Sequence, residues 1–204
     1  MTEKRFARIK KTVEKRQKSL TLVLENVHDP HNVSAIFRTA DAVGIDRIYL
    51  VYNTNKFPKI GRVSSASANK WIQKIKYDNI ADCYGELKSK DFMIYSTYMG
   101  DAGESNSLYE LDLTVKTAFV LGNEHEGVSE EAREHADKNF LIPMYGMVQS
   151  LNVSVSAAIC MYEALRQRET KGMYESSEYS QGELKEKLDL YLEKGTRHNT
   201  KIKS

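Results

Sequence analysis

The sequence is poor in cysteine, and its cysteines are not arranged for cross-linking. Only Cys83 and Cys160 are present, far apart in the chain and each among apolar residues. A thiol in such a context is typical of a small buried side chain rather than of a disulfide partner. The sequence therefore predicts a protein of a reducing compartment.

Long apolar runs and clustered metal ligands are also missing. No run of apolar residues approaches the roughly 18 that cross a bilayer, and no apolar stretch of a signal peptide follows the basic N-terminus. The five histidines show no zinc-like spacing with one another or with cysteine. We therefore expect a soluble, cytoplasmic protein with no membrane partner and no bound metal.

The overall charge is nearly balanced, but its distribution is not. Thirty Lys and Arg residues stand against 28 Asp and Glu residues, a formal net charge of +2, so total charge identifies no nucleic-acid partner. Residues 1–18 hold eight basic residues against two acidic ones. Such an end can supply phosphate contacts, although a solvated, flexible end would carry the same pattern. The candidate RNA-binding residues here are Lys4, Arg5, Arg8, Lys11 and Lys15.

Short apolar runs of strand length alternate with segments of helical periodicity. Residues 20–24 and 48–52 are typical of buried strands, and between them apolar residues recur at steps of three and four from Val33 until Gly44, a typical helix stop. This pattern predicts an α/β fold with a mostly parallel sheet and helices on both faces. Further strands are expected at 72–77, 92–97, 117–121 and 140–142, and further helices at 80–87 and 151–168.

The polar ends divide the chain into three parts. Residues 1–18, without proline or glycine, are expected to form a basic N-terminal helix, and residues 19–169 the main domain. Residues 170–204 should form a C-terminal helical extension, with an amphipathic helix that docks on the main domain or on a second subunit. Within the main domain, the small and polar residues 100–111 are expected to form a loop.

Three segments place polar residues and glycines where a strand gives way to a helix, which is where open α/β sheets bind ligands. In the first, Asn32 is well suited to cap a helix, and this role competes equally with a ligand role. Arg38 follows Phe37 in a helix with apolar neighbours, where a guanidinium needs an anionic partner or a cleft. Arg38 is therefore the stronger candidate for chemistry.

The second segment begins at Gly122, directly after the expected strand at 117–121. Gly122 would let the backbone approach a ligand closely, and Gly127 can take a conformation that other residues avoid. Taken alone, the segment is better explained as a turn before a helix capped by Ser129. Its glycine spacing matches neither a dinucleotide fingerprint nor a P-loop.

The third segment runs from residue 141 to 158 and joins apolar residues to a polar turn. Ile142, Met144 and Leu151 could form apolar walls around an adenine ring while free backbone groups form hydrogen bonds with its edge. The helix that follows is rich in Ser and Ala, which permits close packing of backbones.

Taken in order, the three segments resemble the motifs of the SPOUT methyltransferases, and among them the TrmH family of RNA ribose 2′-O-methyltransferases. The matching residues are Asn32 with Arg38-Thr39, then Gly122-x-Glu124-x-x-Gly127, then Ile142-Pro143-Met144 with Gln149-Ser150-Leu151-Asn152-Val153-Ser154-Val155. The resemblance also extends through residues 25–28, 70–71, 166–168 and 172–174, and so covers nearly the whole chain.

This resemblance implies a deep C-terminal trefoil knot, S-adenosyl-L-methionine as cofactor, and a homodimer whose subunits complete the active site. It also implies methylation of a ribose 2′-hydroxyl in tRNA, at the D-loop guanosine of position 18. The positions that match cofactor contacts are Thr97, Gly122, Ile142 and Leu151. Arg38 matches the catalytic arginine, and the polar residues that shape the site match Asn32, Glu124, Ser150 and Asn152.

A guanidinium, with a pKa above about 12, is a poor general base. Arg38 is therefore expected to grip the phosphate beside the target ribose and to stabilise the developing oxyanion, with help from that phosphate in any proton abstraction.

One departure from the family pattern concerns the substrate. Relatives tend to have a Gly-Ser-His run before Lys-Trp, whereas this chain has Ser67-Ala68-Asn69 before Lys70-Trp71. This segment is expected to contact RNA or the cofactor tail, so Lys70 joins the candidate RNA-binding residues.

Two alternatives stay open, namely methylation of ribosomal RNA and a non-catalytic RNA-binding protein on the same scaffold. Ribosomal relatives often carry a separate N-terminal domain, whereas here a short basic helix leads straight into the first strand. The intact set of site residues disfavours the non-catalytic alternative.

Overall fold

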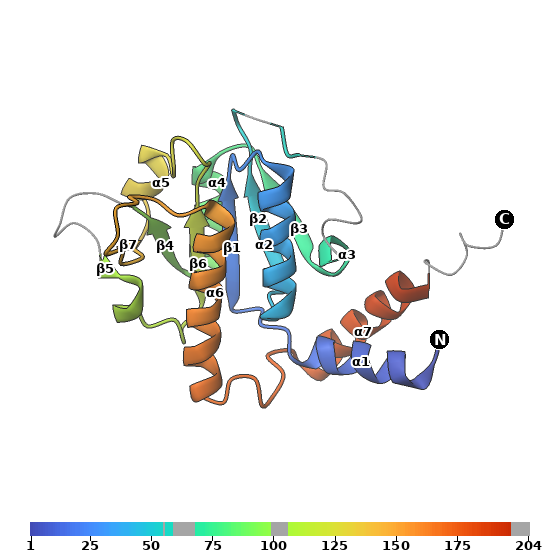
Figure 1. The fold of residues 1–204 in the computed structure, drawn as a ribbon. Helices are drawn as coiled ribbons and strands as arrows, with labels where there is room; N and C mark the ends of the chain where they lie inside the picture. Colours follow the sequence, from blue (N-terminus) through green and yellow to red (C-terminus); the bar gives the residue numbers. More distant parts are fainter. Residues whose placement is uncertain (55, 59–67, 99–105, 197–204) are drawn as a thin grey trace.

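One parallel sheet lies between two layers of helices, and the first and last helices lie to one side (Figure 1). The computed structural model describes residues 1–54, 56–58, 68–98 and 106–196. The strands are β1 Leu20–Glu25, β2 Arg47–Val51, β3 Gln73–Tyr77, β4 Met93–Thr97, β5 Asn106–Ser107, β6 Thr117–Leu121 and β7 Lys138–Leu141. The helices are α1 Glu3–Glu14, α2 Pro30–Ala42, α3 Ala68–Trp71, α4 Ile80–Ser89, α5 Glu130–Glu134, α6 Val153–Thr170 and α7 Gln181–Thr196, with a 3-10 turn η1 at Leu108–Glu110.

The strands of the described chain form a single sheet in the order β3-β2-β1-β6-β4-β7-β5, and every pairing between them is parallel. At its centre, β1 and β6 are buried along their whole length, as their continuous apolar runs predict. Their register pairs Leu22 with Phe119 and Leu24 with Leu121. The predicted fold class is confirmed. Because all strands are parallel, their carboxyl ends meet at one edge, where such sheets bind ligands.

The two helical layers enclose separate apolar cores. On one face, α2 and α6 pack side by side, and Phe37 and Met161 join a core that includes Phe119 (Figure 1). On the other face, α4 and α5 enclose a second core around Tyr84 and Val120. Neighbouring residues of β6 thus serve opposite cores, as the alternation of side chains along a strand requires.

Both cysteines lie in these layers, free and fully buried, as predicted. Burial raises the pKa of the Cys83 thiol to about 12. Over the described ranges, no helix is long and apolar enough to cross a membrane. Within the same ranges, no group of three or more His, Cys, Asp or Glu side chains is placed to hold a metal ion.

Helix α2 begins one turn earlier than an Asn32 cap would allow. Its N-cap is Asp29, whose Oδ1 accepts a hydrogen bond from the backbone N–H of His31 at 2.8 Å. Asn32 is buried inside the first turn instead, so the capping role that the sequence allowed for it is wrong. Gly44, at φ +87°, follows the end of the helix as predicted.

The last strand of the sequence lies inside the sheet rather than at its edge. β7 lies between β4 and β5, although the chain passes from β4 to β5 and on to β6 before it reaches β7. Strand β7 is thus inserted between two strands that precede it in the chain.

The predicted loop at 100–111 is only partly tested. Residues 100–105 lie outside the described residues. Residues 106–110 form β5 and η1, so the expectation of an irregular loop was wrong there. The two residues of β5 pair with β7, a partner more than thirty positions later in sequence, which local composition does not reveal.

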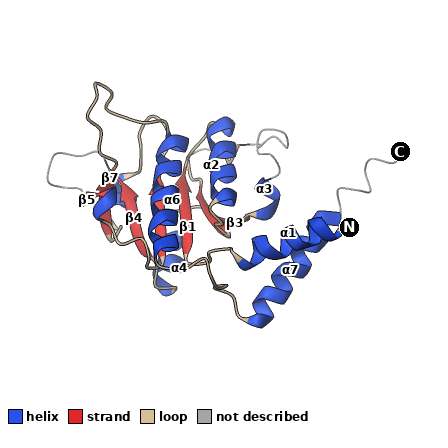
Figure 2. Cartoon of the chain, turned by 60° about the horizontal axis from the view of Figure 1, so that its bottom comes forward, coloured by secondary structure: helices blue, strands red, loops and turns tan. Residues whose placement is uncertain are grey.

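The terminal helices α1 and α7 pack against each other beside the sandwich (Figure 2). Ile9 and Val13 of α1 contact Tyr191 of α7, and Trp71 of α3 packs against the same group. The C-terminal part thus contains the helix α7, which packs on α1 and on Trp71 of α3. Helix α1 ends at Glu14 rather than at residue 18.

Two fully buried arginines connect the terminal segments to the central sheet and its helices. Arg16 donates to the carbonyl oxygen of Ile45 at 2.8 Å and to Oη of Tyr191 at 3.1 Å, and it pairs with Asp41. Arg168 of α6 donates to three backbone carbonyl oxygens, those of Leu113 at 2.9 Å, Ser19 at 3.0 Å and Val115 at 2.7 Å. A buried guanidinium satisfied in this way gives a connection of fixed geometry.

Candidate active site

A cavity of about 630 Å³ opens at the carboxyl edge of the sheet, where β4, β6 and β7 end and α6 begins. The four predicted cofactor-binding residues all line it: Thr97, Gly122, Ile142 and Leu151. The predicted catalytic residues divide into those that line it, which are Glu124, Ser150 and Asn152, and those that do not, which are Asn32 and Arg38. The second and third motif segments therefore meet at one hollow.

The turn after β6 is shaped by two glycines. Asn123 and Gly127 exchange two backbone hydrogen bonds of 3.1 Å, and Gly127 has φ +71°. A Cβ on Gly122 would lie 1.9 Å from the carbonyl oxygen of Gly127, closer than any side chain permits. Glycine is thus required at 122 by the approach of the turn itself. Ser129 caps the helix that follows, as predicted.

Three polar side chains from three segments form one hydrogen-bonded chain beside the cavity. Nδ2 of Asn32 donates to Oε1 of Glu124 at 2.8 Å, and Nδ2 of Asn152 donates to Oδ1 of Asn32 at 3.0 Å. Asn152 also caps α6, where its Oδ1 accepts from the backbone N–H of Ser154 at 2.8 Å. We call Asn32, Glu124 and Asn152 the Asn–Glu–Asn triad. It connects the first motif segment to the other two.

Glu124 is held in its ionised form by the groups around it. Burial alone would raise its pKa, but the hydrogen bond from Asn32, backbone N–H groups and the nearby His28 outweigh burial, so the pKa of Glu124 is lowered. Its second oxygen, Oε2, receives no hydrogen bond of good geometry and lies 3.2 Å from Nδ1 of His28. The cavity edge therefore carries a fixed negative charge.

His28 belongs to the site, although the sequence motifs did not select it. Its ring stacks on that of His125, with centroids 5.5 Å apart and planes inclined by 28°. His125 in turn lines the cavity. The available signal was its place in the matched segment 25–28, directly after a buried strand.

Arg38 lies on the exposed surface of α2, away from the cavity of its own chain. Within the described chain its guanidinium makes no hydrogen bond or ion pair. Six positions separate Arg38 from Asn32, which turns the two side chains about 120° apart around the helix axis. A single chain therefore leaves Arg38 without the anionic partner or cleft that its sequence context predicts.

The candidate RNA-binding residues of α1 have different surroundings. Lys4, Arg8 and Lys11 are exposed on its surface and make no side-chain hydrogen bond or ion pair with the described C-terminal part of the chain. The other two contact the C-terminal part of the chain, where Lys15 donates to the carbonyl oxygen of Tyr174 and Arg5 donates to that of Gly195 at 3.1 Å. Arg5 and Lys15 therefore also help to hold the terminal segments together.

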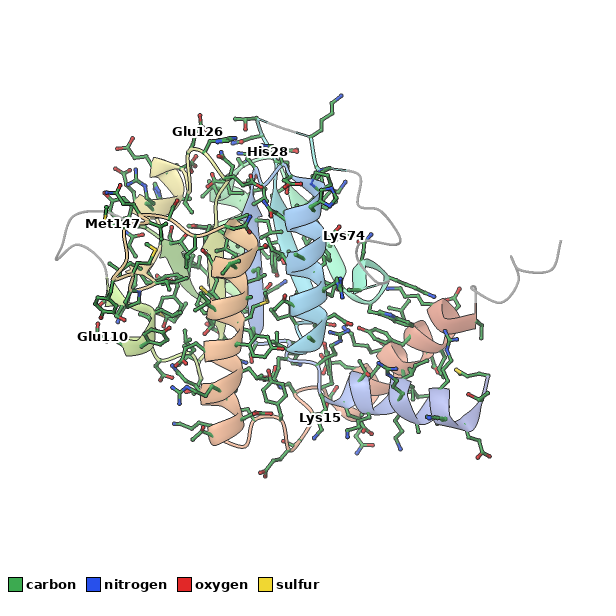
Figure 3. All side chains as sticks on the ribbon, in the orientation of Figure 1. Lys15, His28, Lys74, Glu110, Glu126 and Met147 are labelled. Atoms are coloured by element: carbon green, nitrogen blue, oxygen red, sulfur yellow. The ribbon has the colours of Figure 1, made fainter. Side chains whose placement is uncertain are left out.

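Lys70 belongs to a group of cations built by four elements. Burial, then Arg5 of α1 and Lys194 of α7, lower the pKa of Lys70. The pKa of Lys74 in β3 is lowered by burial and then by Lys194 and Lys76. Figure 3 shows Lys74 beside α2. We call Arg5, Lys70, Lys74 and Lys194 the basic cluster; Lys74 and Lys194 were missed because they are scattered in sequence.

The third motif segment and α6 expose apolar side chains. Tyr145 and Met147 are each 99% exposed, and Figure 3 shows Met147 at the edge of the molecule. Val148 beside them and Val155 and Tyr162 on α6 are also exposed. We call these five residues the apolar surface. Val155 and Tyr162 are seven positions apart and so share one face of α6, and exposed apolar side chains of this kind mark surfaces that bind another molecule.

Comparison with known proteins gives consistent matches. Residues 19–162 match the model of the SpoU rRNA Methylase family. The chain is 45% identical over 186 residues to the tRNA (guanosine(18)-2'-O)-methyltransferase of Aquifex aeolicus, which covers 91% of this chain and 87% of that protein. It is 40% identical over 151 residues to the 23S rRNA (guanosine-2'-O-)-methyltransferase RlmB of Pasteurella multocida, which covers 73% of this chain and 60% of that protein.

A solved structure agrees with the fold. The A. aeolicus TrmH/SpoU tRNA modifying enzyme superposes with a TM-score of 0.86 at 44% identity, over 94% of this chain and 97% of that one. The family match contains the whole sheet, the Asn–Glu–Asn triad and the start of α6. Both the sequence motifs and the architecture therefore show that this chain belongs to the SpoU methylase family, the TrmH branch of the SPOUT fold.

Proposed function

We propose that the protein is a soluble cytoplasmic enzyme that transfers a methyl group from S-adenosyl-L-methionine to the ribose 2′-hydroxyl of guanosine 18 in the D-loop of tRNA. The observation that carries this proposal is the Asn–Glu–Asn triad at the edge of a cavity of about 630 Å³. A non-catalytic RNA-binding protein would need no carboxylate held ionised beside a ligand cavity.

The cavity suits the methyl donor in size and in chemistry. Pockets of roughly 300–1,000 Å³ with apolar walls and a few polar groups hold ligands of this class. Ile142 and Leu151 would supply apolar walls, Thr97 and Gly122 would hold the donor at the strand ends, and Glu124 complements its positive charge. When bound, this cofactor supplies a methyl group already activated by positive sulfur. The protein must then align the ribose oxygen and remove its proton.

We assign to Arg38 two roles: it binds the phosphate beside the target ribose, and it stabilises the oxyanion that develops on the 2′-oxygen. Its planar guanidinium can bind a phosphate through two parallel hydrogen bonds. Because Arg38 is exposed and lies away from the cavity of its own chain, we assign it to the cavity of a partner subunit. Ser150, which lines the cavity, would help to position the ribose.

A homodimer would cover the apolar surface. Exposed tyrosine, methionine and valine side chains on the third motif segment and on α6 favour burial against a second copy. This surface adjoins residues 150–152 of the cavity, so a dimer formed through it would place the partner's residues near the site. Sedimentation at micromolar concentration should give twice the mass of one chain.

The terminal helices support tRNA over ribosomal RNA. The alignment with the tRNA-modifying relative spans 186 residues and so must include parts of the segments outside 19–169, whereas the alignment with the ribosomal relative spans 151. The packed pair of α1 and α7 carries Arg5 and Lys194 of the basic cluster and the exposed cations of α1, which would contact RNA phosphates. We assign no metal to the reaction.

The test is to incubate purified protein with labelled S-adenosyl-L-methionine and, separately, with tRNA and ribosomal RNA. Mapping of 2′-O-methylated nucleotides should then find label at guanosine 18 of tRNA. Label only in ribosomal RNA would overturn the substrate, and label only on a base would overturn the reaction. Binding of tRNA without any transfer would favour the non-catalytic alternative.

A further inference from the structure

The imidazole of His28 is held in one orientation at the cavity edge. His28 lies between the end of β1 and the N-cap of α2, and Nδ1 lies 3.2 Å from Oε2 of Glu124. Its ring stacks on that of His125. The backbone before it is also fixed, because Oη of Tyr52 donates to the carbonyl oxygen of Val27 at 2.6 Å. Figure 3 shows His28 beside the turn that carries Glu126.

This orientation determines which ring nitrogen can accept a proton. Because Nδ1 lies 3.2 Å from the negative charge of Glu124, that charge favours the neutral ring with its proton on Nδ1 and a lone pair on Nε2. Among the described residues, Nε2 of His28 makes no hydrogen bond. The side chain is 43% exposed, so the ring is accessible to solvent.

The other ionisable groups around His28 are less suited to accept the ribose proton. Glu124 accepts a hydrogen bond from Asn32 on Oε1, its Oε2 lies 3.2 Å from Nδ1 of His28, and its lowered pKa makes it a weak base. Oδ1 of Asp29 caps α2. Tyr52 is a hydrogen-bond donor whose pKa is raised by burial and by Glu124. His125 lacks a carboxylate partner among the described residues, so nothing fixes which of its nitrogens is bare.

We propose that His28 is the general base of the reaction and that Glu124 is its positioning residue; this inference rests on the proposed function. The 2′ O–H bond breaks as its proton moves to Nε2. The oxygen forms its new bond to the methyl carbon while the carbon–sulfur bond of the sulfonium donor breaks, with both electrons staying on sulfur. The imidazolium, partly exposed, then returns its proton to water, and Glu124 stabilises its charge.

The first test reads the tautomer without any substrate or cofactor. In long-range ¹⁵N–¹H NMR spectra of the folded chain at pH 8, the neutral ring of His28 should show a protonated Nδ1 and a bare Nε2. The substitution His28→Asn assigns the signal. A ring protonated on Nε2 would overturn the proposal, because that nitrogen could then accept nothing.

The second test uses His28→Asn in single-turnover methylation of tRNA. An asparagine amide can replace Nδ1 as a donor to Glu124 but cannot accept a proton, so the network is kept and the base is lost. General bases contribute roughly 10²–10⁴-fold to rate, and we expect a loss of about 100-fold at pH 8 with the affinity for the methyl donor within about twofold of the original. His135→Gln, at the exposed C-cap of α5, is the matched control and should keep the full rate.

The pH dependence separates chemistry from mere support of the fold. In the original protein the rate should rise with pH as the base loses its proton, and this rise should vanish in His28→Asn. A slower variant that keeps the same rise would overturn the proposal, as would an original protein whose rate does not depend on pH. Failure of the original protein to methylate any RNA would instead overturn the proposed function.

Discussion

Nδ2 of Asn152 donates a hydrogen bond to Oδ1 of Asn32 at 3.0 Å, across 120 positions of sequence. Because Asn152 also caps α6 and Asn32 also binds Glu124, this contact fixes the start of α6 and the start of α2 against one carboxylate. The positions of these two helix starts beside the cavity thus depend on side chains from three different motif segments.

Replacing Asn32 should weaken both stability and catalysis. Asn32→Ala leaves Oε1 of Glu124 and Nδ2 of Asn152 without this partner, which costs about 1–3 kcal/mol for buried polar groups. The loss should appear in urea unfolding, and the methylation rate should fall about tenfold or more. Asn32→Asp should be worse, because it sets a second carboxylate against Glu124. An Asp variant as stable and as active as the original would contradict the triad.

Gly122→Ala should abolish binding of the methyl donor. A Cβ there would overlap the carbonyl of Gly127, so the turn that lines the cavity must open. Calorimetry should show at least a tenfold loss of affinity for S-adenosyl-L-methionine. Gly85→Ala in α4 is the control: no heavy atom lies within 4 Å of its new Cβ, and the change should stabilise the helix by about 0.5–1 kcal/mol. Equal affinity in the two variants would contradict the close approach.

The lowered pKa of Glu124 predicts how its contribution to stability varies with pH. A carboxylate with a depressed pKa contributes stability that is complete above its unfolded value, about 4.3, and is lost as pH falls through the folded value. The difference in unfolding free energy between the original protein and Glu124→Gln should be constant above about pH 5 and shrink below it. Urea unfolding at several pH values measures this, and a difference that grows on acidification would contradict it.

The basic cluster should appear in the salt dependence of RNA binding. Each phosphate contact contributes roughly 0.7–0.9 to the slope of log affinity against log salt. The combined variant Lys70→Ala, Lys74→Ala, Lys194→Ala should therefore lower the slope by about 2–3 in tRNA binding assays. Lys116→Ala, a surface lysine paired with Asp91, is the control. If the triple variant and Lys116→Ala give the same slope, the side chains of the basic cluster are only solvated and do not contact RNA.

Arg168 should be among the residues that stability depends on most. Arg168→Met leaves three backbone carbonyl oxygens and Glu178 without this guanidinium, and breaking such a buried arrangement costs about 3–5 kcal/mol. Thermal unfolding should show a large decrease in midpoint. Lys171→Ala, at the exposed C-cap of the same helix, should change it little. A small effect at Arg168 would show that the terminal segments are fastened elsewhere.

Local pattern predicted the sheet well, because buried parallel strands must be continuous apolar runs. β6 was placed at its observed residues, and β1 and β2 within one or two. The local sequence pattern failed where a residue distant in the chain determines the role of a side chain. Asn32 looked like a cap, but its amide is bound by Glu124, 92 positions away.

The site was also predicted only in part from the sequence. The cavity residues followed from motif resemblance, yet the exposure of Arg38 could not, since helical periodicity does not tell which polar face meets a second chain. Lys74 and Lys194 of the basic cluster were missed because the cluster is assembled from four elements.

Binding of the methyl donor tests the central claim most directly, because the claim is that three distant segments build one hollow for it. Titration calorimetry of the purified chain with S-adenosyl-L-methionine should give saturable heat, with no more than one molecule bound per chain. The same titration with Gly122→Ala should give none under those conditions. Absence of heat with the original protein, or unchanged heat with the variant, would contradict the account.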